Sequence, residues 1–285
     1  MPSNVYANYN RIKSAIMLSL CWVFTGVIVG LLVLVIGYLV SIGYKSVNWA
    51  FFTQLPVPPG GTGYPGGMLN GIVGTIILVL LASLLGIPVG MLTGIYLSEY
   101  GANSRLSSPV RFVCDVLAGV PSIVVGILGY ELLVVPLGSY NGYAGALALA
   151  FIMVPIVART TEEMLKLVPH SYREASIALG ATKSRTILRV VVPAATGSLI
   201  TGVMLAIARV AGETAPLLFT ALGSRFLEKN PSHPFPSLTV MIYHYAQGPY
   251  KEENQEAWAG ILVLITLIFV LNMGVRFVAR PKKLG

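Results

Sequence analysis

Charged side chains are scarce in this sequence. Asp, Glu, Lys and Arg make up 11% of the 285 residues, against about 25% in ordinary soluble domains. The mean hydropathy is +0.77. This deficit of charge excludes an ordinary soluble domain and indicates that lipid is the main solvent of the chain. The apolar residues gather in six blocks, each long enough for a membrane span of about 20 residues. The sequence therefore predicts an all-α integral membrane protein with six transmembrane helices.

The sequence shows no pattern typical of a disulfide framework, a metal site or a nucleotide-binding loop. Cys21 and Cys114 lie in or beside different apolar blocks, so we expect packing residues and no disulfide framework. The three histidines lack the spacing of metal ligands. The phosphate loop G-x-x-x-x-G-K-[ST] is absent, which excludes an ATPase function for this chain. We expect no catalytic residue, no metal site and no cofactor bound by the chain itself.

The predicted spans form one transmembrane domain, 14–278, between a cytoplasmic segment at 1–13 and a cytoplasmic tail at 279–285. The first apolar block is longer than the apolar region of a cleaved signal peptide, about 7–15 residues, so we interpret it as a retained signal anchor. The fourth span is the shortest, and a long inner connection at 159–196 joins it to the fifth. The spans lie near 14–42, 70–97, 112–136, 142–158, 197–222 and 258–278.

The distribution of Lys and Arg predicts the orientation. With the N-terminus in the cytoplasm, fourteen of the nineteen basic residues fall on the inner side and four on the outer side, while Arg209 lies inside the membrane. This bias follows the positive-inside rule and predicts that both termini are cytoplasmic. It also accounts for the formal net charge of +8, so the basic balance requires no nucleic-acid partner. Membrane lipid is the expected environment.

The connection between spans four and five has the pattern of two short helices. Ser171 and Glu174 have the spacing of a capping box, with Ser171 as the N-cap. Gly180 accepts a left-handed conformation and is expected to end this helix. Thr182 is placed to cap a second helix that ends before Pro193. On periodicity alone, such a hairpin can dock on a partner protein or lie on the bilayer surface.

The spacing within this connection resembles a known family motif. EASIALG, nine residues and then VVVP resemble the EAA loop of ABC-transporter permeases. The resemblance implies that the loop is a coupling helix that fits a cleft in a separate ATP-binding subunit. The motif positions are Glu174, Ala175, Ser176, Gly180, Val190, Val192 and Pro193.

Arg209 and Glu213 stand inside an otherwise apolar run, ARVAGETAPLL. A charged residue near the centre of a span costs about 2.5–3.5 kcal/mol on insertion scales, so the pair needs a reason. The two residues are one helical turn apart and share a face, where they can pair. Gly212 and Pro216 loosen the helix around them, which suits a span beside a cavity or a moving element.

A salt bridge that serves packing alone is one interpretation of this pair. A substrate pathway is the other, because intramembrane ionisable residues typically mark one. The planar guanidinium of Arg209 matches phosphate-type oxyanions and stays charged at working pH. We expect Arg209 to be an anion ligand or gate, and Glu213 to hold the guanidinium and offset part of its charge.

The run ARVAGETAPLLF also resembles one particular kind of importer subunit. Together with LAGVPSIVVG (117–126) and ART-EEML (158–165), it is similar to the A-type permease subunit of phosphate-specific ABC importers. The resemblance extends from about the first span to the C-terminus. It implies a MetI-like type I importer permease in the cytoplasmic (inner) membrane of a prokaryote, which imports inorganic phosphate and has Arg209 in the phosphate path.

The same resemblance implies partners. A sister permease subunit (PstC-like) would form the other half of the path, and two ATP-binding subunits (PstB-like) would carry ATP with Mg²⁺. An extracytoplasmic phosphate-binding protein (PstS-like) would deliver the substrate. The residues themselves leave two other functions open: a proton-coupled secondary anion transporter with Glu213 as the proton carrier, and a membrane scaffold that transports nothing.

Four further residues lie near the membrane edges or at an expected bend in span three. Pro121 is expected to kink span three, and Ser122 to bond the freed carbonyl or to contribute to a gate. Asp115 is expected to pair or to lie at the inner interface. Arg159 ends the fourth span, where the positive-inside rule accounts for it, and an exit-side contact with the anion is the alternative.

Overall fold

The structure is a computed structural model that describes residues 3–101 and 104–278, and these residues form helices and no strand. Five helices are long and apolar enough to cross a membrane, and a bent pair of helices brings the number to six when it is counted as one span. The predicted all-α membrane fold with six spans is therefore confirmed. The tail predicted at 279–285 lies outside the described residues.

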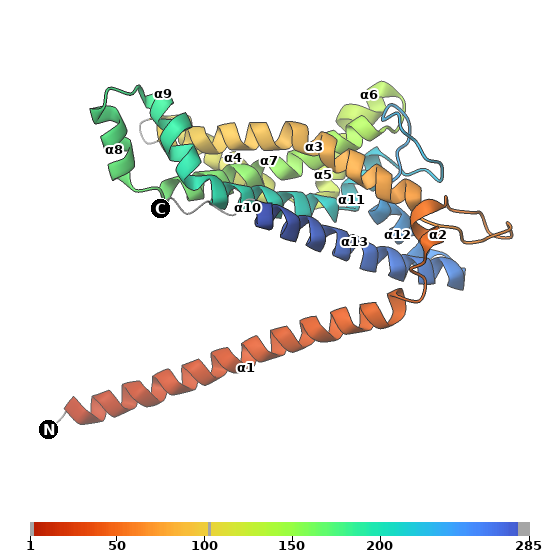
Figure 1. Ribbon diagram of the computed structural model, residues 1–285, viewed down its shortest axis with the longest axis horizontal. Helices are drawn as coiled ribbons and strands as arrows, with labels where there is room; N and C mark the ends of the chain where they lie inside the picture. The colour runs from red at the N-terminus through yellow and green to blue at the C-terminus, as the bar shows by residue number, and fades with distance from the viewer. Residues whose placement is uncertain (1–2, 102–103, 279–285) are drawn as a thin grey trace.

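The helices follow one another with short turns at one end of the bundle and longer irregular segments at the other. The hairpin of α8 and α9 marks one end, which we call the hairpin end, while α2 and α6 lie at the opposite end (Figure 1). The α-helices are α1 (Ser3–Gly43), α2 (Trp49–Thr53), α3 (Leu69–Ile95), α4 (Ser107–Gly119), α5 (Ser122–Gly129), α6 (Val135–Leu137), α7 (Gly142–Lys166), α8 (His170–Ala178), α9 (Lys183–Thr186), α10 (Val192–Ala211), α11 (Ala215–Thr220), α12 (Leu238–Gln247) and α13 (Lys251–Val278), and the π-helical turns are η1 (Tyr96–Tyr100), η3 (Tyr130–Val134) and η4 (Ile187–Val191).

Helix α7 is the centre of the fold. In its apolar stretch 67% of the residues are buried, against 6% in α1. Its small residues and the glycines of α3 let the two helices approach closely, as small residues do in membrane bundles. A Cβ added at Gly90 would lie 2.7 Å from Cβ of Val157, and one at Gly94 would lie 2.5 Å from the carbonyl oxygen of Ala158. The helix predicted to be the shortest span is thus the most enclosed one.

Helix α7 also continues past the end predicted at 158. It runs to Lys166 because its last two turns remain enclosed, with Thr161, Glu162 and Leu165 all buried. Hydropathy predicted an end at Arg159 because charged residues begin there. In the structure Arg159 lies inside the helix. Ion pairs within α7 and with α4 satisfy the charges at this end, since Glu162 accepts from Arg159 and Lys166 of α7 and from Arg111 of α4.

The predicted third span is broken and not merely kinked. Helices α4 and α5 are bent by 102° at the residues between them. Val120 is extended, with a ψ of 131°, because the residue before a proline is driven out of the helical region. Pro121 also leaves the helical region, with a ψ of 135°. Ser122 is the first residue of α5, directly after the break.

The predicted fifth span begins earlier than expected and is interrupted. Helical backbone continues from α9 through η4 into α10, from Lys183 to Ala211. The second loop helix therefore does not end before Pro193 as predicted. Pro193 lies in the first turn of α10, a position where a proline is tolerated. The helix ends at Ala211, and α11 begins only at Ala215.

Helix α1 stands apart from the others. It diverges from the bundle toward the N-terminus and approaches α13 only near its C-terminal end (Figure 1). There, Tyr38 and Trp258 make an edge-to-face contact with ring centroids 5.7 Å apart. A Cβ at Gly43 would lie 2.8 Å from the Trp258 carbonyl oxygen. The apolar length of α1 is therefore exposed in this chain alone, as expected of a surface that faces lipid or another membrane subunit.

Candidate functional site

The Arg209–Glu213 pair lies at the interruption of the fifth span. Arg209 occupies the last turn of α10, and Glu213 lies in the linker to α11. Nη2 of Arg209 is 3.6 Å from Oε1 of Glu213, and the two side chains are 54% and 14% exposed. The predicted contact is present, but it is longer than a charge-assisted hydrogen bond of about 2.7–2.9 Å. The guanidinium is therefore restrained by the carboxylate and still accessible.

The linker has a definite geometry that the sequence explains. Gly212 caps α10, with its N–H bonded to the Arg209 carbonyl at 3.1 Å. Pro216 stands at the start of α11, where its missing N–H leaves no helical bond unmade. The Thr239 hydroxyl of α12 donates to the Glu213 carbonyl at 3.0 Å. The continuous helix expected through 197–222 was wrong, because Gly212 and Pro216 end one helix and begin another.

A buried carboxylate at the hairpin end organises a second charged cluster. Glu162 on α7 is fully buried and accepts from three cations. Nε of Arg111 is 2.7 Å away, Nζ of Lys166 2.6 Å and Nη1 of Arg159 3.2 Å. Nη2 of Arg159 also lies 2.7 Å from Oδ1 of Asp115 on α4. Asp115 therefore pairs with a basic residue, one of the two roles expected for it. The cluster ties α4 to α7 beside the break at Pro121.

Sequence reasoning singled out Arg159 and missed the carboxylate that holds it. The signal lay within ARTTEEMLK, where basic residues stand three before and four after Glu162, spacings that place them on one helix face. The contribution of Arg111 could not be found in this way, because it lies 51 positions away. In the structure Arg159 is 35% exposed and engaged on two sides.

A third ion pair anchors the hairpin. Arg173 on α8 and Glu99 on η1 bond through two atom pairs, Nη2–Oε1 at 2.7 Å and Nε–Oε2 at 3.1 Å. The side chains are only 15% and 6% exposed. The Glu99 carboxylate raises the pKa of Arg173 above its usual range, because the bonded charged form is favoured. Sequence reasoning did not select this pair, whose members lie 74 positions apart.

The turn of the hairpin was predicted correctly from the sequence, but the start of its first helix was not. Gly180 has a φ of +82°, as predicted for a left-handed turn. The Thr182 hydroxyl accepts from the Arg185 N–H at 3.4 Å, as predicted for an N-cap. The capping box at Ser171 was wrong: with Ser171 as the N-cap the helix would begin at Tyr172, whereas α8 begins two residues earlier, at His170, and Pro169 precedes it with no side-chain cap. A proline with fixed φ directs the chain into the helix without one.

Some of the expected coupling residues lie on the outer surface of this hairpin, while Ser176 faces inward and Pro193 lies beyond it in α10. Glu174 and Ala175 are exposed, and Leu179 at the tip is 89% exposed. Ser176 faces inward, where its hydroxyl lies 2.9 Å from that of Thr186 on α9. This hydrogen bond holds the two arms of the hairpin together. It leaves Leu179 exposed at the tip and the Glu174 carboxylate exposed beside it.

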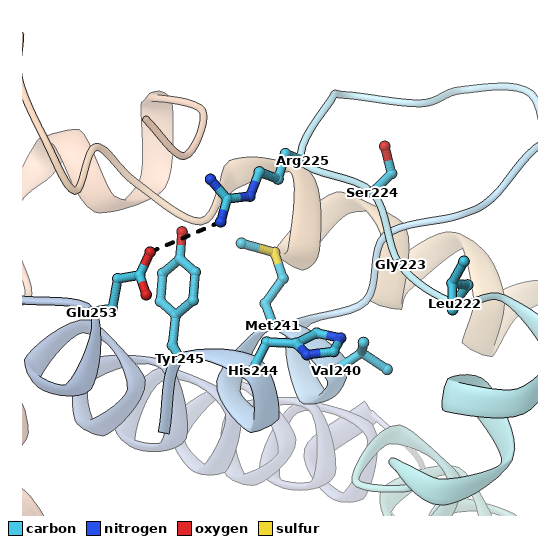
Figure 2. Close-up of a pocket in the computed structure, with 9 residues that line it drawn as sticks. All are labelled: Leu222, Gly223, Ser224, Arg225, Val240, Met241, His244, Tyr245 and Glu253. Carbon is cyan, nitrogen blue, oxygen red and sulfur yellow. Dashed lines mark ion pairs between the residues drawn. The ribbon is translucent and has the colours of Figure 1, made fainter. Parts of the chain in front are cut away.

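A cavity of about 320 Å³ opens at the end of the bundle opposite the hairpin. Arg225, from the irregular segment after α11, points toward Glu253 on α13, and their charged atoms are 4.0 Å apart (Figure 2). Tyr245 of α12 lies between them in this view. Burial raises the pKa of Tyr245 to about 12. The other lining residues are Leu222, Gly223, Ser224, Val240, Met241 and His244.

The acidic, histidine and cysteine side chains do not assemble into a metal site. Within residues 3–101 and 104–278, no group of three or more of them has the placement that a metal ion requires. Several ionisable groups instead pair with opposite charges: Glu99 with Arg173, Arg159 with Asp115 and Glu162, Arg209 with Glu213, and Arg225 with Glu253.

Comparison with known proteins identifies the class to which this fold and these clusters belong. Residues 86–283 match the family model described as binding-protein-dependent transport system inner membrane component. The phosphate transport system permease protein PstA of Yersinia pestis is 44% identical over 86% of this chain and 82% of that protein. The PstA of Haemophilus influenzae is 39% identical over 98% of both chains. The chain belongs to the PstA family of phosphate transport permeases.

Solved structures agree with PstA family membership at the level of the fold. The chain is similar to a subunit of the MetNI methionine ABC transporter in inward-facing form, with a TM-score of 0.65, 20% identity and coverage of 75% of this chain and 94% of that one. A bacterial ABC transporter involved in alginate import gives 0.66 at 12% identity, covering 99% and 100%. The predicted MetI-like permease fold is confirmed, and the chain is a multi-pass membrane permease of the ABC importer class.

Proposed function

We propose that this chain forms half of the path through which an ATP-driven importer moves inorganic phosphate, with Arg209 as the anion ligand. The observation that carries this proposal is the loose ion pair at the interruption of the fifth span. A half-exposed guanidinium 3.6 Å from its carboxylate can exchange that partner for a phosphate oxygen. Glu213 then restrains Arg209 when no anion is bound, which keeps the anion from binding too tightly to leave.

The hairpin of α8 and α9 is the part that couples this path to ATP. Glu174, Ala175 and the exposed tip at Leu179 present a docking surface, which Ser176 and Gly180 hold in shape. An ATP-binding subunit docked there would bind ATP with Mg²⁺, and this chain would take no part in the hydrolysis. Helical backbone runs from the hairpin to Arg209 through Pro193 without a break, so a displacement of the hairpin reaches the anion site.

The assembly proposed around this chain follows from its family. It contains a sister permease, two ATP-binding subunits and an extracytoplasmic phosphate-binding protein, with both termini of this chain in the cytoplasm. The hairpin end is then the inner end. Arg159, held between Asp115 and Glu162, is proposed as an exit-side contact, and Ser122 at the break of the third span as part of a gate.

Phosphate uptake by the assembled importer in liposomes tests the energy source. We expect radiolabelled phosphate to accumulate only with hydrolysable ATP inside the vesicles, and to do so equally with and without a protonophore. Uptake that continues with a non-hydrolysable nucleotide, or that a protonophore abolishes while ATP hydrolysis continues, would identify a proton-coupled carrier and overturn the proposal. A complex that hydrolyses ATP and moves no phosphate would identify a scaffold.

A further inference from the structure

The hairpin has a second connection to the path, separate from the continuous helix into α10. We propose that Glu99 and Arg173 are positioning residues that transmit movement of the hairpin through η1 to Arg159, an inference that rests on the proposed function. The connection is a series of polar contacts that crosses four elements, α8, η1, α4 and α7, and each contact joins atoms within hydrogen-bond distance.

The first contact fixes α8 to η1. Arg173 donates twice to Glu99, at 2.7 and 3.1 Å. Two further N–H groups of the same guanidinium donate to the Val168 carbonyl at 2.7 Å and the Leu165 carbonyl at 2.9 Å. These carbonyls belong to the end of α7 and the turn that follows it. A planar fork that is satisfied on both sides holds its geometry more rigidly than a single charge contact.

The other arm of the hairpin contacts the same π-helical turn. Nζ of Lys183 lies 4.3 Å from the ring centroid of Tyr100, a distance suited to a cation–π contact. The Tyr100 and Ser184 hydroxyl oxygens are 3.4 Å apart. Both arms, α8 and α9, therefore contact η1, the turn directly after α3, so a movement of the hairpin would act on this turn.

The next contacts join η1 to the charged cluster around Glu162. Arg111 on α4 donates Nη2 to the Leu97 carbonyl of η1 at 3.1 Å and Nε to Glu162 at 2.7 Å. The other carboxylate oxygen of Glu162 accepts from Arg159 at 3.2 Å. One guanidinium thus bridges the end of α3 to the carboxylate that positions the proposed exit arginine.

The local backbone suits a transmitting element. The last carbonyls of a helix have no partner within it, and the Leu97 carbonyl obtains one from Arg111 instead. Gly101 directly after η1 keeps space for this contact, since a Cβ there would lie 3.3 Å from Nη2 of Arg111. Single π-helical turns within α-helices occur frequently at functional sites.

A purely structural pair would share these distances, so the test needs a readout that stability alone does not change. That readout is the number of phosphate ions transported per ATP hydrolysed by the reconstituted importer. We expect Glu99→Gln and Arg173→Lys each to lower this ratio roughly 2- to 30-fold, the range of measured effects on coupling between sites. ATP hydrolysis and co-purification of the ATP-binding subunit are expected to persist. Glu163→Gln is the matched control, because Glu163 is exposed at the same end of α7.

A double-mutant cycle and a distant variant complete the test. The Glu99→Gln/Arg173→Lys double variant is expected to lower the ratio no further than the stronger single variant, because both remove one contact. Arg111→Lys keeps a charge beside Glu162 but loses the fork that also reaches Leu97. It lies away from the hairpin, so we expect the same fall in the ratio with docking intact.

Three results would overturn the inference. An unchanged ratio in the Glu99 and Arg173 variants would show that the pair transmits nothing. A fall only in proportion to lost ATP-binding subunit would show a structural role in docking, as would an unchanged ratio in Arg111→Lys. A wild-type importer that transports phosphate without ATP would instead contradict the proposed function itself, which separates the two failures.

Discussion

Glu213 lies outside the helix that carries Arg209, yet its carboxylate is 3.6 Å from the Arg209 guanidinium. The contact therefore depends on the linker at 212–214 and not on a rigid helix face. A pair built across a linker can open by a change of a few backbone angles, whereas the same pair within a helix stays close. The position of this pair is consistent with a ligand that must be bound and released in each cycle.

Replacing Gly212 with alanine tests the importance of the linker. The added Cβ would have no heavy atom nearer than 3.6 Å, so the change is free of steric conflict. Alanine favours helix over glycine by about 1 kcal/mol, which extends α10 and moves the Glu213 carbonyl away from Thr239. We expect phosphate uptake to fall about fivefold with normal assembly. Gly26→Ala in α1, where a Cβ meets nothing within 4 Å, is the control; equal uptake in both variants would contradict the role of the linker.

Removing the buried carboxylate at the hairpin end should destabilise the protein. Glu162→Gln leaves Arg111, Arg159 and Lys166 without their shared anion. The cations left behind are 33–53% exposed, so the expected loss is about 1–3 kcal/mol, below that of a fully buried pair. The measurement is the free energy of unfolding or the Tm of the purified complex. Glu163→Gln changes the neighbouring exposed carboxylate and should leave the Tm unchanged. Identical Tm values for the two variants would refute the assignment of Glu162 as the centre of the cluster.

The turn of the hairpin gives a prediction about docking. Gly180 has a φ of +82° and open space around its α-carbon, so alanine there is disfavoured by conformation alone, by roughly 1–2 kcal/mol. We expect Gly180→Ala to lower the amount of ATP-binding subunit that co-purifies. Asparagine tolerates the left-handed region, so Gly180→Asn should retain more of that subunit. If alanine and asparagine behave alike, the backbone conformation of the turn is not what docking requires.

The free energy of unfolding should depend on pH in the alkaline range because of Tyr245, in the cavity opposite the hairpin end. Burial raises the pKa of Tyr245 from 10.0 to about 12, so the folded protein holds this proton more tightly than the unfolded chain does. Its contribution is complete below pH 10 and is lost as the pH rises toward 12, by roughly 2–3 kcal/mol in all. Tyr245→Phe should remove this part of the pH dependence of unfolding, while Tyr143→Phe, at a half-exposed residue, should retain it. Equal pH profiles would contradict the shifted pKa.

Hydropathy alone was sufficient to predict the number of spans but not where each helix ends. The predicted fifth span, 197–222, began where polar residues become rare, whereas the helix begins at Lys183 because its backbone bonds continue through η4 and Pro193. The fourth span was cut at 158 for the same reason. Charged residues end an apolar run in the sequence, but tertiary partners allow the helix to continue.

Whether an ion pair of the candidate site could be predicted depends on how far apart its two residues lie in the sequence. Arg209 and Glu213 could be paired from the sequence because a spacing of four residues keeps two side chains close on a helix, although the contact in the structure forms across the linker after α10. Glu99 with Arg173 and Arg111 with Glu162 could not, since separations of 74 and 51 residues carry no periodicity. Which distant charges meet is decided by how α3, α4 and α8 pack on α7, and a single sequence does not contain that packing in readable form.

The most direct measurement is ATP-driven phosphate uptake by importers that carry Arg209→Lys or Arg209→Gln, with Arg105→Gln at an exposed turn as the control. Lysine keeps the charge and loses the fork, so we expect partial uptake. Glutamine loses both, and loss of hydrogen bonds to a charged ligand predicts a fall of roughly 10- to 100-fold with assembly and basal ATP hydrolysis retained. Uptake in the glutamine variant equal to that of the control would contradict the claim that Arg209 binds the transported anion.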